Sequence, residues 1–159
     1  MDSILGSQSS ITIWLWLFPI TYVIHIAEEY WGGEGYVAYL FRLRGVRMSP
    51  ARFLFLQSIG LVGMSVLVVL SQLLNFRQFM LAMLGTITLL NGITHTVTAI
   101  SHQGYGPGLV SCVLTWIPLG LVTLIFVFGQ TSIFSYVTAV AIGVAMIGFI
   151  AALTMRGGR

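Results

Sequence analysis

The chain contains three histidines, and each lies in a polar cluster within an otherwise apolar sequence. His25 opens a His-x-x-Glu-Glu motif that ends at Glu29, and His95 closes an Asn-x-x-x-His motif that begins at Asn91. His102 precedes a glycine-rich loop. Imidazole and carboxylate side chains that lie together suit a divalent metal ion, with zinc as the first choice and iron or manganese as alternatives. These residue types therefore indicate a metal site.

Such a site predicts metal-dependent hydrolysis. Catalytic zinc takes three protein ligands and lowers the pKa of a bound water to about 7. We expect Glu28 to act as a ligand or as the general base, and Glu29 to be its partner in proton transfer. Asn91 and Tyr105 are expected to orient a ring nitrogen or to polarise a substrate oxygen. The predicted ligands are His25, Glu28, Glu29, His95 and His102, and the predicted catalytic residues are Glu28, Glu29, Asn91 and Tyr105.

The same residues also fit functions that need no bound metal ion for catalysis. A metal-free isomerase or cyclase could use a glutamate and a histidine for proton transfer. A proton or metal-ion transporter could use them as a pathway, although few polar residues continue toward the opposite end of the spans. Each residue could also serve structure alone. Glu29 could reach water at the membrane surface, His95 could hydrogen-bond a neighbouring helix, and His102 could lie in a loop.

The composition is that of a membrane protein. Of the 159 residues, 57% are hydrophobic and only 7% are charged, whereas about a quarter of the residues in a soluble domain are charged. An ionisable side chain inside a bilayer is costly, which makes the polar clusters candidates for function. The single Cys112 excludes an internal disulfide. The seven arginines follow no nucleic-acid-binding pattern, so we expect no nucleic-acid partner.

Five apolar segments are long enough to cross a bilayer, which requires about 20 residues per helix. They predict an all-α, polytopic membrane bundle that forms a single domain over residues 1–159. Ser49 followed by Pro50 is typical of a helix start. Residues 36–44 suit a short interfacial helix as well as they suit a plain loop. The predicted spans are residues 11–30, 52–74, 79–101, 109–128 and 132–155.

The arginines orient the bundle. Only Arg77 lies at one end of the predicted spans, and the other six lie at the opposite end. These six are Arg42, Arg44, Arg47, Arg52, Arg156 and Arg159. The positive-inside rule then places the C-terminus in the cytoplasm and the N-terminus outside. Because the first residues lack the basic region of a signal peptide, we expect the first span to remain in the mature protein. The expected setting is a bacterial-type plasma membrane with membrane lipids around the bundle, and homo-oligomer formation stays open.

This orientation, derived without the histidines, brings the polar motifs together. Spans one and three run in the same direction, so all three histidines lie at similar depth toward the cytoplasmic end. Spacings of three and four residues place both glutamates on the His25 side of the first helix. The same spacings form a polar seam on the third span, which we expect to face the bundle interior. The seam consists of Thr88, Asn91, His95, Thr98 and His102.

The three motifs together resemble those of the HXXEE family of small integral membrane proteins. The family pattern combines H-x-x-E-E, N-x-x-x-H and a histidine followed by tyrosine and glycine. These correspond to His25–Glu29, Asn91–His95 and His102–Gly108. The resemblance implies a membrane enzyme whose motifs form the active site, without specifying a substrate or a reaction. We therefore expect an intramembrane metal-dependent hydrolase that acts on a hydrophobic or lipid-like substrate near the cytoplasmic leaflet.

Overall fold

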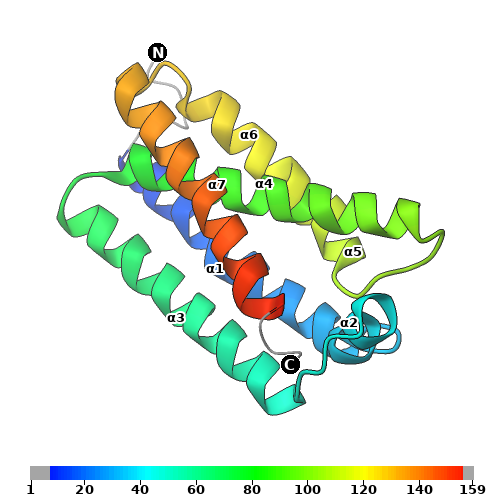
Figure 1. Ribbon diagram of the computed structural model, residues 1–159. Coiled ribbons are helices and arrows are strands. Elements are labelled where there is room, and N and C mark those ends of the chain that lie inside the picture. Colours follow the sequence, from blue (N-terminus) through cyan, green and yellow to red (C-terminus); the bar gives the residue numbers. More distant parts are fainter. Residues whose placement is uncertain (1–7, 156–159) are drawn as a thin grey trace.

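The computed structural model describes residues 8–155 as helices joined by short connections (Figure 1). No strand occurs within this described range, which confirms the predicted all-α fold. Arg156 and Arg159, which contributed to the predicted orientation, lie outside it. The elements are α1 (Gln8–Trp31), α2 (Tyr36–Arg44), α3 (Pro50–Leu73), α4 (Arg77–Ser101), α5 (Leu109–Ser111), the π-helix η1 (Cys112–Trp116), α6 (Ile117–Val127) and α7 (Ile133–Met155).

Five segments of the described chain are long and apolar enough to cross a membrane, so the protein is an integral membrane protein. Each end of a span lies within two residues of its predicted position. The fourth span is composite, because α5, η1 and α6 follow one another without a break. Pro118 has no amide hydrogen for the carbonyl four residues earlier. The preceding turn is widened, and the N–H of Ile117 bonds to the carbonyl of Cys112. Such π turns are frequent at functional sites.

A short helix follows the first span, where the sequence suited either an interfacial helix or a loop. α2 occupies the predicted range and ends at Gly45, which takes a left-handed conformation (φ 66°). Arg42 ties the helix to the preceding turn, because its guanidinium donates to Glu34 Oε1 at 2.6 and 2.8 Å. The next span starts as predicted, with Ser49 Oγ accepting a hydrogen bond from the N–H of Arg52.

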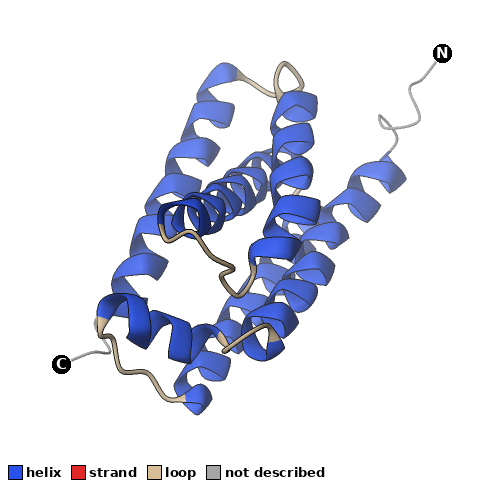
Figure 2. Cartoon of the chain, turned by 90° about the vertical axis from the view of Figure 1, so that its right-hand side faces the viewer, coloured by secondary structure: helices blue, strands red, loops and turns tan. Residues whose placement is uncertain are grey.

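The centre of the bundle is α4. Figure 2 looks almost along this helix, which lies in the middle with other spans around it. It is buried continuously from Met80 to Thr88 and packs mainly against α6 and α7. The close approach of α6 and α7 to α4 depends on glycine. A Cβ on Gly120 would lie 2.7 Å from the carbonyl oxygen of Gly85, and one on Gly143 would lie 2.9 Å from the Cβ of Thr86.

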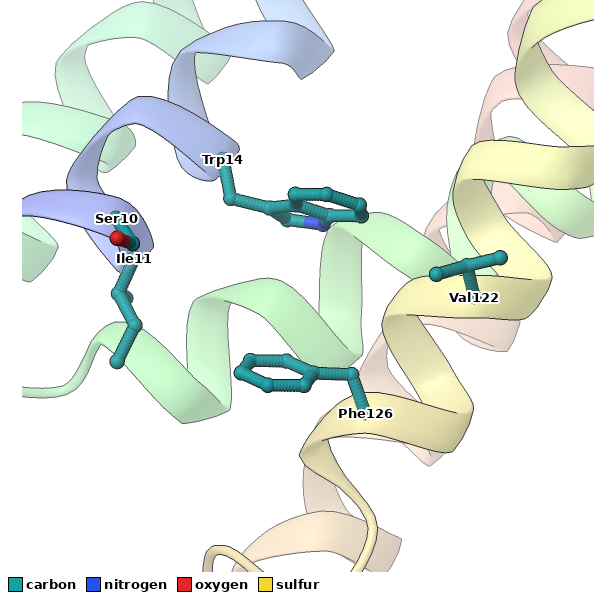
Figure 3. Close-up of a pocket in the computed structure, with 5 residues that line it drawn as sticks. All are labelled: Ser10, Ile11, Trp14, Val122 and Phe126. Carbon is teal, nitrogen blue, oxygen red and sulfur yellow. The ribbon is translucent and has the colours of Figure 1, made fainter. Parts of the chain in front are cut away.

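The end of the bundle away from α2 is held by apolar packing between α1, α4 and α6. Figure 3 shows Trp14 and Phe126 reaching from α1 and α6 into the space between these helices. The indole N–H of Trp14 donates to Thr123 Oγ1 at 2.7 Å. A crevice of about 20 Å³ remains beside these rings, and none of the side chains that line it is titratable. Among the described residues, the lining of this crevice therefore offers packing and no acid–base group.

Candidate metal centre

The polar motifs meet at the α2 end of the bundle, where the last turns of α1 approach α4, α5 and α3 (Figure 1). α1 contributes His25 and Glu29, which are only 1% and 3% exposed. α4 contributes His95, whose side chain is 13% exposed. We refer to His25, Glu29 and His95 as the candidate centre. The structure thus joins the two motifs that the sequence placed at one depth.

In the candidate centre, one carboxylate oxygen faces a ring nitrogen of each histidine. Glu29 Oε1 lies 3.6 Å from His25 Nε2 and 3.5 Å from His95 Nε2. These separations are longer than a direct hydrogen bond, which spans about 2.7–3.2 Å. They resemble the edge of a tetrahedron around a metal ion, because ligand bonds of about 2.0–2.2 Å place neighbouring ligand atoms about 3.4 Å apart. Two histidines and one carboxylate also form a recurrent ligand set for zinc and for non-haem iron.

A short hydrogen-bond chain favours the tautomer of His25 that carries its proton on Nδ1. Ser111 Oγ donates to the carbonyl of Gly108 at 3.1 Å, so its lone pair can accept from Nδ1–H of His25, 2.9 Å away. With the proton on Nδ1, the neutral imidazole keeps a lone pair on Nε2, the nitrogen that faces Glu29. A metal-ligating histidine is usually held by a second partner in this manner.

The π-helix η1 supplies two side chains that pack against His25. The Trp116 ring lies over the imidazole with a centroid distance of 3.9 Å and an interplanar angle of 32°. Cys112 Sγ lies 3.7 Å from His25 Nδ1. Ligand atoms of His25, His95 and Cys112 all fall within 4.8 Å of one another, so the thiol is a neighbouring donor. The thiol lies beside Nδ1, whereas Glu29 Oε1 lies beside Nε2 of the same ring.

Glu28 has a different set of partners from Glu29. Its Oε1 accepts from the Tyr105 hydroxyl at 2.8 Å and from the N–H of Val110 at 2.9 Å, and its Oε2 accepts from the N–H of Ser111 at 2.6 Å. The carboxylate therefore caps the first turn of α5 from a neighbouring helix, where negative charge is stabilised. The sequence predicted Glu28 as a ligand or base, whereas in the structure it anchors the loop.

Tyr105 closes this loop over the end of α1. Burial, and next the hydrogen bond to Glu28, raise the pKa of its hydroxyl to about 12, so the group is a donor at neutral pH. The ring packs against two glycines. A Cβ on Gly32 would lie 2.6 Å from the hydroxyl oxygen, and one on Gly33 would lie 3.1 Å from Cε1. Tyr105, predicted as catalytic, is placed here to position Glu28.

Glu29 is held from α3 by a side chain that the motif spacings did not indicate. Gln57 Nε2 donates to Glu29 Oε2 at 2.6 Å, and the Tyr22 hydroxyl donates to Gln57 Oε1 at 2.5 Å. Because an amide donates only through its nitrogen and accepts only through its oxygen, the two contacts fix its orientation. Oε2 of Glu29 is thereby tied to α3, and Oε1 is left to face the two imidazoles.

Gly108 lies against all three members of the candidate centre. Its backbone is left-handed, with a φ of 87°. A Cβ at this position would lie 2.6 Å from His25 Cε1, 3.0 Å from His95 Cε1 and 3.1 Å from Glu29 Cγ. Both the conformation and the space therefore require glycine.

The structure does not bring His102 to the candidate centre. It is exposed at the C-cap of α4, seven residues beyond His95, which is about 10 Å along a helix. Asn91 is half-buried one turn before His95, and no hydrogen bond within the described chain joins its amide to the centre. The predicted polar seam thus faces inward at Thr88 and His95 and leaves the interior at His102.

A cleft of about 350 Å³ reaches the candidate centre from the side of α2. It lies between the end of α1, the start of α2 and the start of α3. Glu29 belongs to both the cleft wall and the candidate centre, and Tyr36 and Phe53 supply aromatic surface. The candidate centre therefore communicates with the membrane-surface end of the protein.

The sequence of the chain matches the model of a protein family. Its description is a protein of unknown function with HXXEE motif, and the match covers residues 16–123, which is more than half of the chain. The chain belongs to the HXXEE family. The match includes His25–Glu29, Asn91–His95 and Gly108. A search of curated proteins and a search of solved structures gave no match.

The HXXEE motif divides into two roles in this structure. Its histidine and second glutamate belong to the candidate centre, and its first glutamate caps α5. Two residues that the motifs did not indicate, Gln57 and Trp116, also contribute to the candidate centre, and Gly108 belonged to the third motif without an assigned role. Gln57 could have been found, because a lone amide within a strongly apolar span needs a partner inside the bundle. Trp116 carries no comparable signal, since a core tryptophan is common in any bundle.

Proposed function

We propose that this HXXEE protein is an intramembrane metal-dependent enzyme that hydrolyses a hydrophobic or lipid-like substrate. The observation that carries the proposal is that Glu29 Oε1 lies 3.6 Å from His25 Nε2 and 3.5 Å from His95 Nε2. These three groups would hold a divalent ion, with zinc first and iron or manganese as alternatives. Three protein ligands leave one position for water, as in catalytic zinc sites.

The chemistry follows from this ligand set. A zinc ion so held would lower the pKa of water to about 7 and polarise a carbonyl oxygen. The surrounding residues keep the ligands in place: Gln57 orients Glu29, and Ser111 keeps the lone pair of His25 on Nε2. Trp116 covers one face of His25 with apolar surface. Preorganised groups in a water-poor environment stabilise developing charge more strongly than the same groups in water.

Two other functions fit less of the geometry. A metal-free isomerase or cyclase could share a proton among the same two imidazoles and carboxylate, and it would keep its activity after chelation. A proton or metal-ion transporter needs polar groups across the membrane. In the described chain, α4 buries apolar side chains from Met80 to Leu84 between the candidate centre and the opposite end. The spacing of the three acceptors favours the metal enzyme.

The proposed setting is the cytoplasmic leaflet of a bacterial-type plasma membrane. Its support is the position of four arginines at the same end as the candidate centre: Arg42 and Arg44 lie in α2, Arg47 follows it and Arg52 lies in the first turn of α3. The positive-inside rule expects such arginines at a cytoplasmic end. α3 and α7 have only 11% of their spanning windows buried, which leaves outer faces for membrane lipids or for a second copy.

Metal analysis tests the proposal. Protein in detergent is stripped with a chelator and titrated with zinc, and the bound metal is counted by elemental analysis. We expect about one ion per chain in the wild type and in His102→Ala, and loss of the ion in His25→Ala, His95→Ala and Glu29→Gln. Far-UV circular dichroism controls for folding. A folded wild-type chain that binds no metal, or a Glu29→Gln variant of unchanged affinity, contradicts the proposal.

A further inference from the structure

The cleft at α2 combines one polar wall with an apolar body. Glu29 and Glu34 contribute carboxylates, whereas Val37, Pro50 and Phe53 contribute apolar surface. Its volume of about 350 Å³ lies near the lower end of the range of small-molecule sites, which is about 300–1,000 Å³. Such a space accommodates one head group and the start of a single chain, and it is small for a complete two-chain lipid.

Tyr36 connects this cleft with the candidate centre. Its ring lies 5.6 Å from the Phe53 ring and 6.3 Å from the His95 ring, measured between centroids. Among the described residues, none accepts a hydrogen bond from its hydroxyl. A tyrosine hydroxyl is protonated at neutral pH, because its ordinary pKa is about 10. The group is therefore a protonated donor next to an apolar cleft, without an acceptor in the described part of the protein.

We propose that the cleft binds the uncharged, carbonyl-bearing head of a single-chain amphiphile, and that the Tyr36 hydroxyl donates a hydrogen bond to its carbonyl oxygen. The inference rests on the proposed function, because it places an ester or amide carbonyl beside the candidate centre. It assigns to Tyr36 a substrate-binding role and names α2 as the element that covers the bound head group.

The charges of the cleft favour an uncharged head. Its lining contains two carboxylates, Glu29 and Glu34, and no lysine or arginine. Arg42 on α2 is engaged with Glu34 at 2.6 Å. In the metal-free protein, a carboxylate or phosphate head group would meet the carboxylate of Glu29, which costs affinity. An ester or amide avoids that cost and supplies the acceptor that Tyr36 lacks.

Binding to metal-free protein tests this inference separately from the metal. The protein is placed in phosphatidylcholine nanodiscs with chelator, and the probe is a single-chain acyl amide that carries a fluorophore at the far end of the chain. Specific binding is the part displaced by the unlabelled amide. We expect single-chain esters and amides to compete, and fatty acids, alkyl phosphates and short water-soluble amides to compete at least tenfold less well.

Variants then locate the site. Tyr36→Phe should weaken binding about three- to tenfold, which corresponds to one hydrogen bond between uncharged groups. Val37→Trp fills the cleft and should abolish displaceable binding, with Ala38→Trp as a second filling variant if the first fails to fold. Tyr136→Phe is the matched control, because Tyr136 bonds to the carbonyl of Leu124 on α6, and it should bind as the wild type does.

Two outcomes overturn the inference: equal binding by Tyr36→Phe and the wild type, or competition by fatty acids as strong as that by esters. Because the assay contains no metal, neither outcome depends on the metal count. Conversely, a chain that binds the amide probe but no zinc refutes the proposed metal enzyme and leaves the cleft assignment intact.

Discussion

The two ends of the bundle are built from the same helices but are packed by different chemistry. Away from α2, Leu15, Phe18, Val68 and Val127 are completely buried in an apolar cluster with the first half of α4. At the α2 end, the candidate centre is buried to a similar degree and consists of acceptor groups facing one another. Within a bilayer the lipid tails are as apolar as the buried side chains, so the apolar end is stabilised by close van der Waals packing between helices. We infer from this difference that packing at the apolar end stabilises the fold and offsets the free-energy cost of bringing the polar groups together at the other end.

The largest contrast is expected between two glycines. Gly108→Ala places a Cβ 2.6 Å from His25 Cε1 at a φ of 87°, which combines strain of about 1–2 kcal/mol with overpacking of about 1–3 kcal/mol. We expect zinc affinity to fall by about 100-fold or more. Isothermal titration of chelator-treated protein with zinc measures the change.

Gly63→Ala on α3 is the control, because nothing lies within 4 Å of its added Cβ. It should bind zinc as tightly as the wild type. If Gly108→Ala retains full affinity with a native circular dichroism spectrum, the candidate centre does not depend on this close contact, and the contrast between the two ends loses its strongest support.

A second contrast compares two glutamines on one helix. Gln57→Leu removes the donor to Glu29 Oε2 at 2.6 Å. We expect zinc affinity to fall about 10- to 100-fold, as is usual when a ligand loses its orienting partner. Gln72→Leu, near the other end of α3, removes only a bond to the carbonyl of Val68 and should leave zinc affinity unchanged. Equal effects of the two substitutions would mean that Gln57 acts through general stability.

The same contrast between the two ends bears on what could be predicted from the sequence. The spans follow from length and hydropathy, and Ser49 with Pro50 defines a helix start by local chemistry alone. The co-location of His25 and His95 follows from helix direction. These features depend on residues that are near one another in the sequence, or on the bilayer. The sequence pattern therefore predicts them.

The division of roles within the centre could not be predicted in the same way. The spacing of three and four residues places Glu28 and Glu29 equally near His25, and only the course of the loop before α5 gives Glu28 three donors. His102 continues the three- and four-residue spacing of the polar seam, but α4 ends at Ser101, one residue earlier. The chain then turns at Gln103, which has a φ of 51°. Contacts between distant segments decide both outcomes.

The apolar end should respond in stability and not in metal binding. Thr123→Val removes the acceptor for the Trp14 indole N–H at 2.7 Å. We expect a loss of about 1 kcal/mol in the free energy of unfolding, with unchanged zinc affinity. Unfolding in mixed detergent micelles measures it, and a double-mutant cycle with Trp14→Phe isolates the pair. Thr138→Val, which loses only a bond to its own helix at Phe134, is the control. A coupling energy of zero, or a change in zinc affinity, would contradict the assignment of stability to the apolar end and of metal binding to the α2 end.

The smallest expected effect is a pH dependence of the loop. Burial and the bond to Glu28 raise the pKa of Tyr105 from 10.0 to about 12. A raised pKa means that folding favours the protonated hydroxyl, so this stabilisation is complete below pH 10 and is lost as the pH rises toward 12. The magnitude should be modest, because the side chain is 43% exposed and the interaction is partly screened by solvent. Unfolding measured at about pH 9 and about pH 11, on either side of the ordinary tyrosine pKa, should give a larger difference for the wild type than for Tyr105→Phe. Identical differences would show that the bond to Glu28 contributes nothing to the loop, and the capping of α5 would then depend on the backbone N–H groups of Val110 and Ser111 alone.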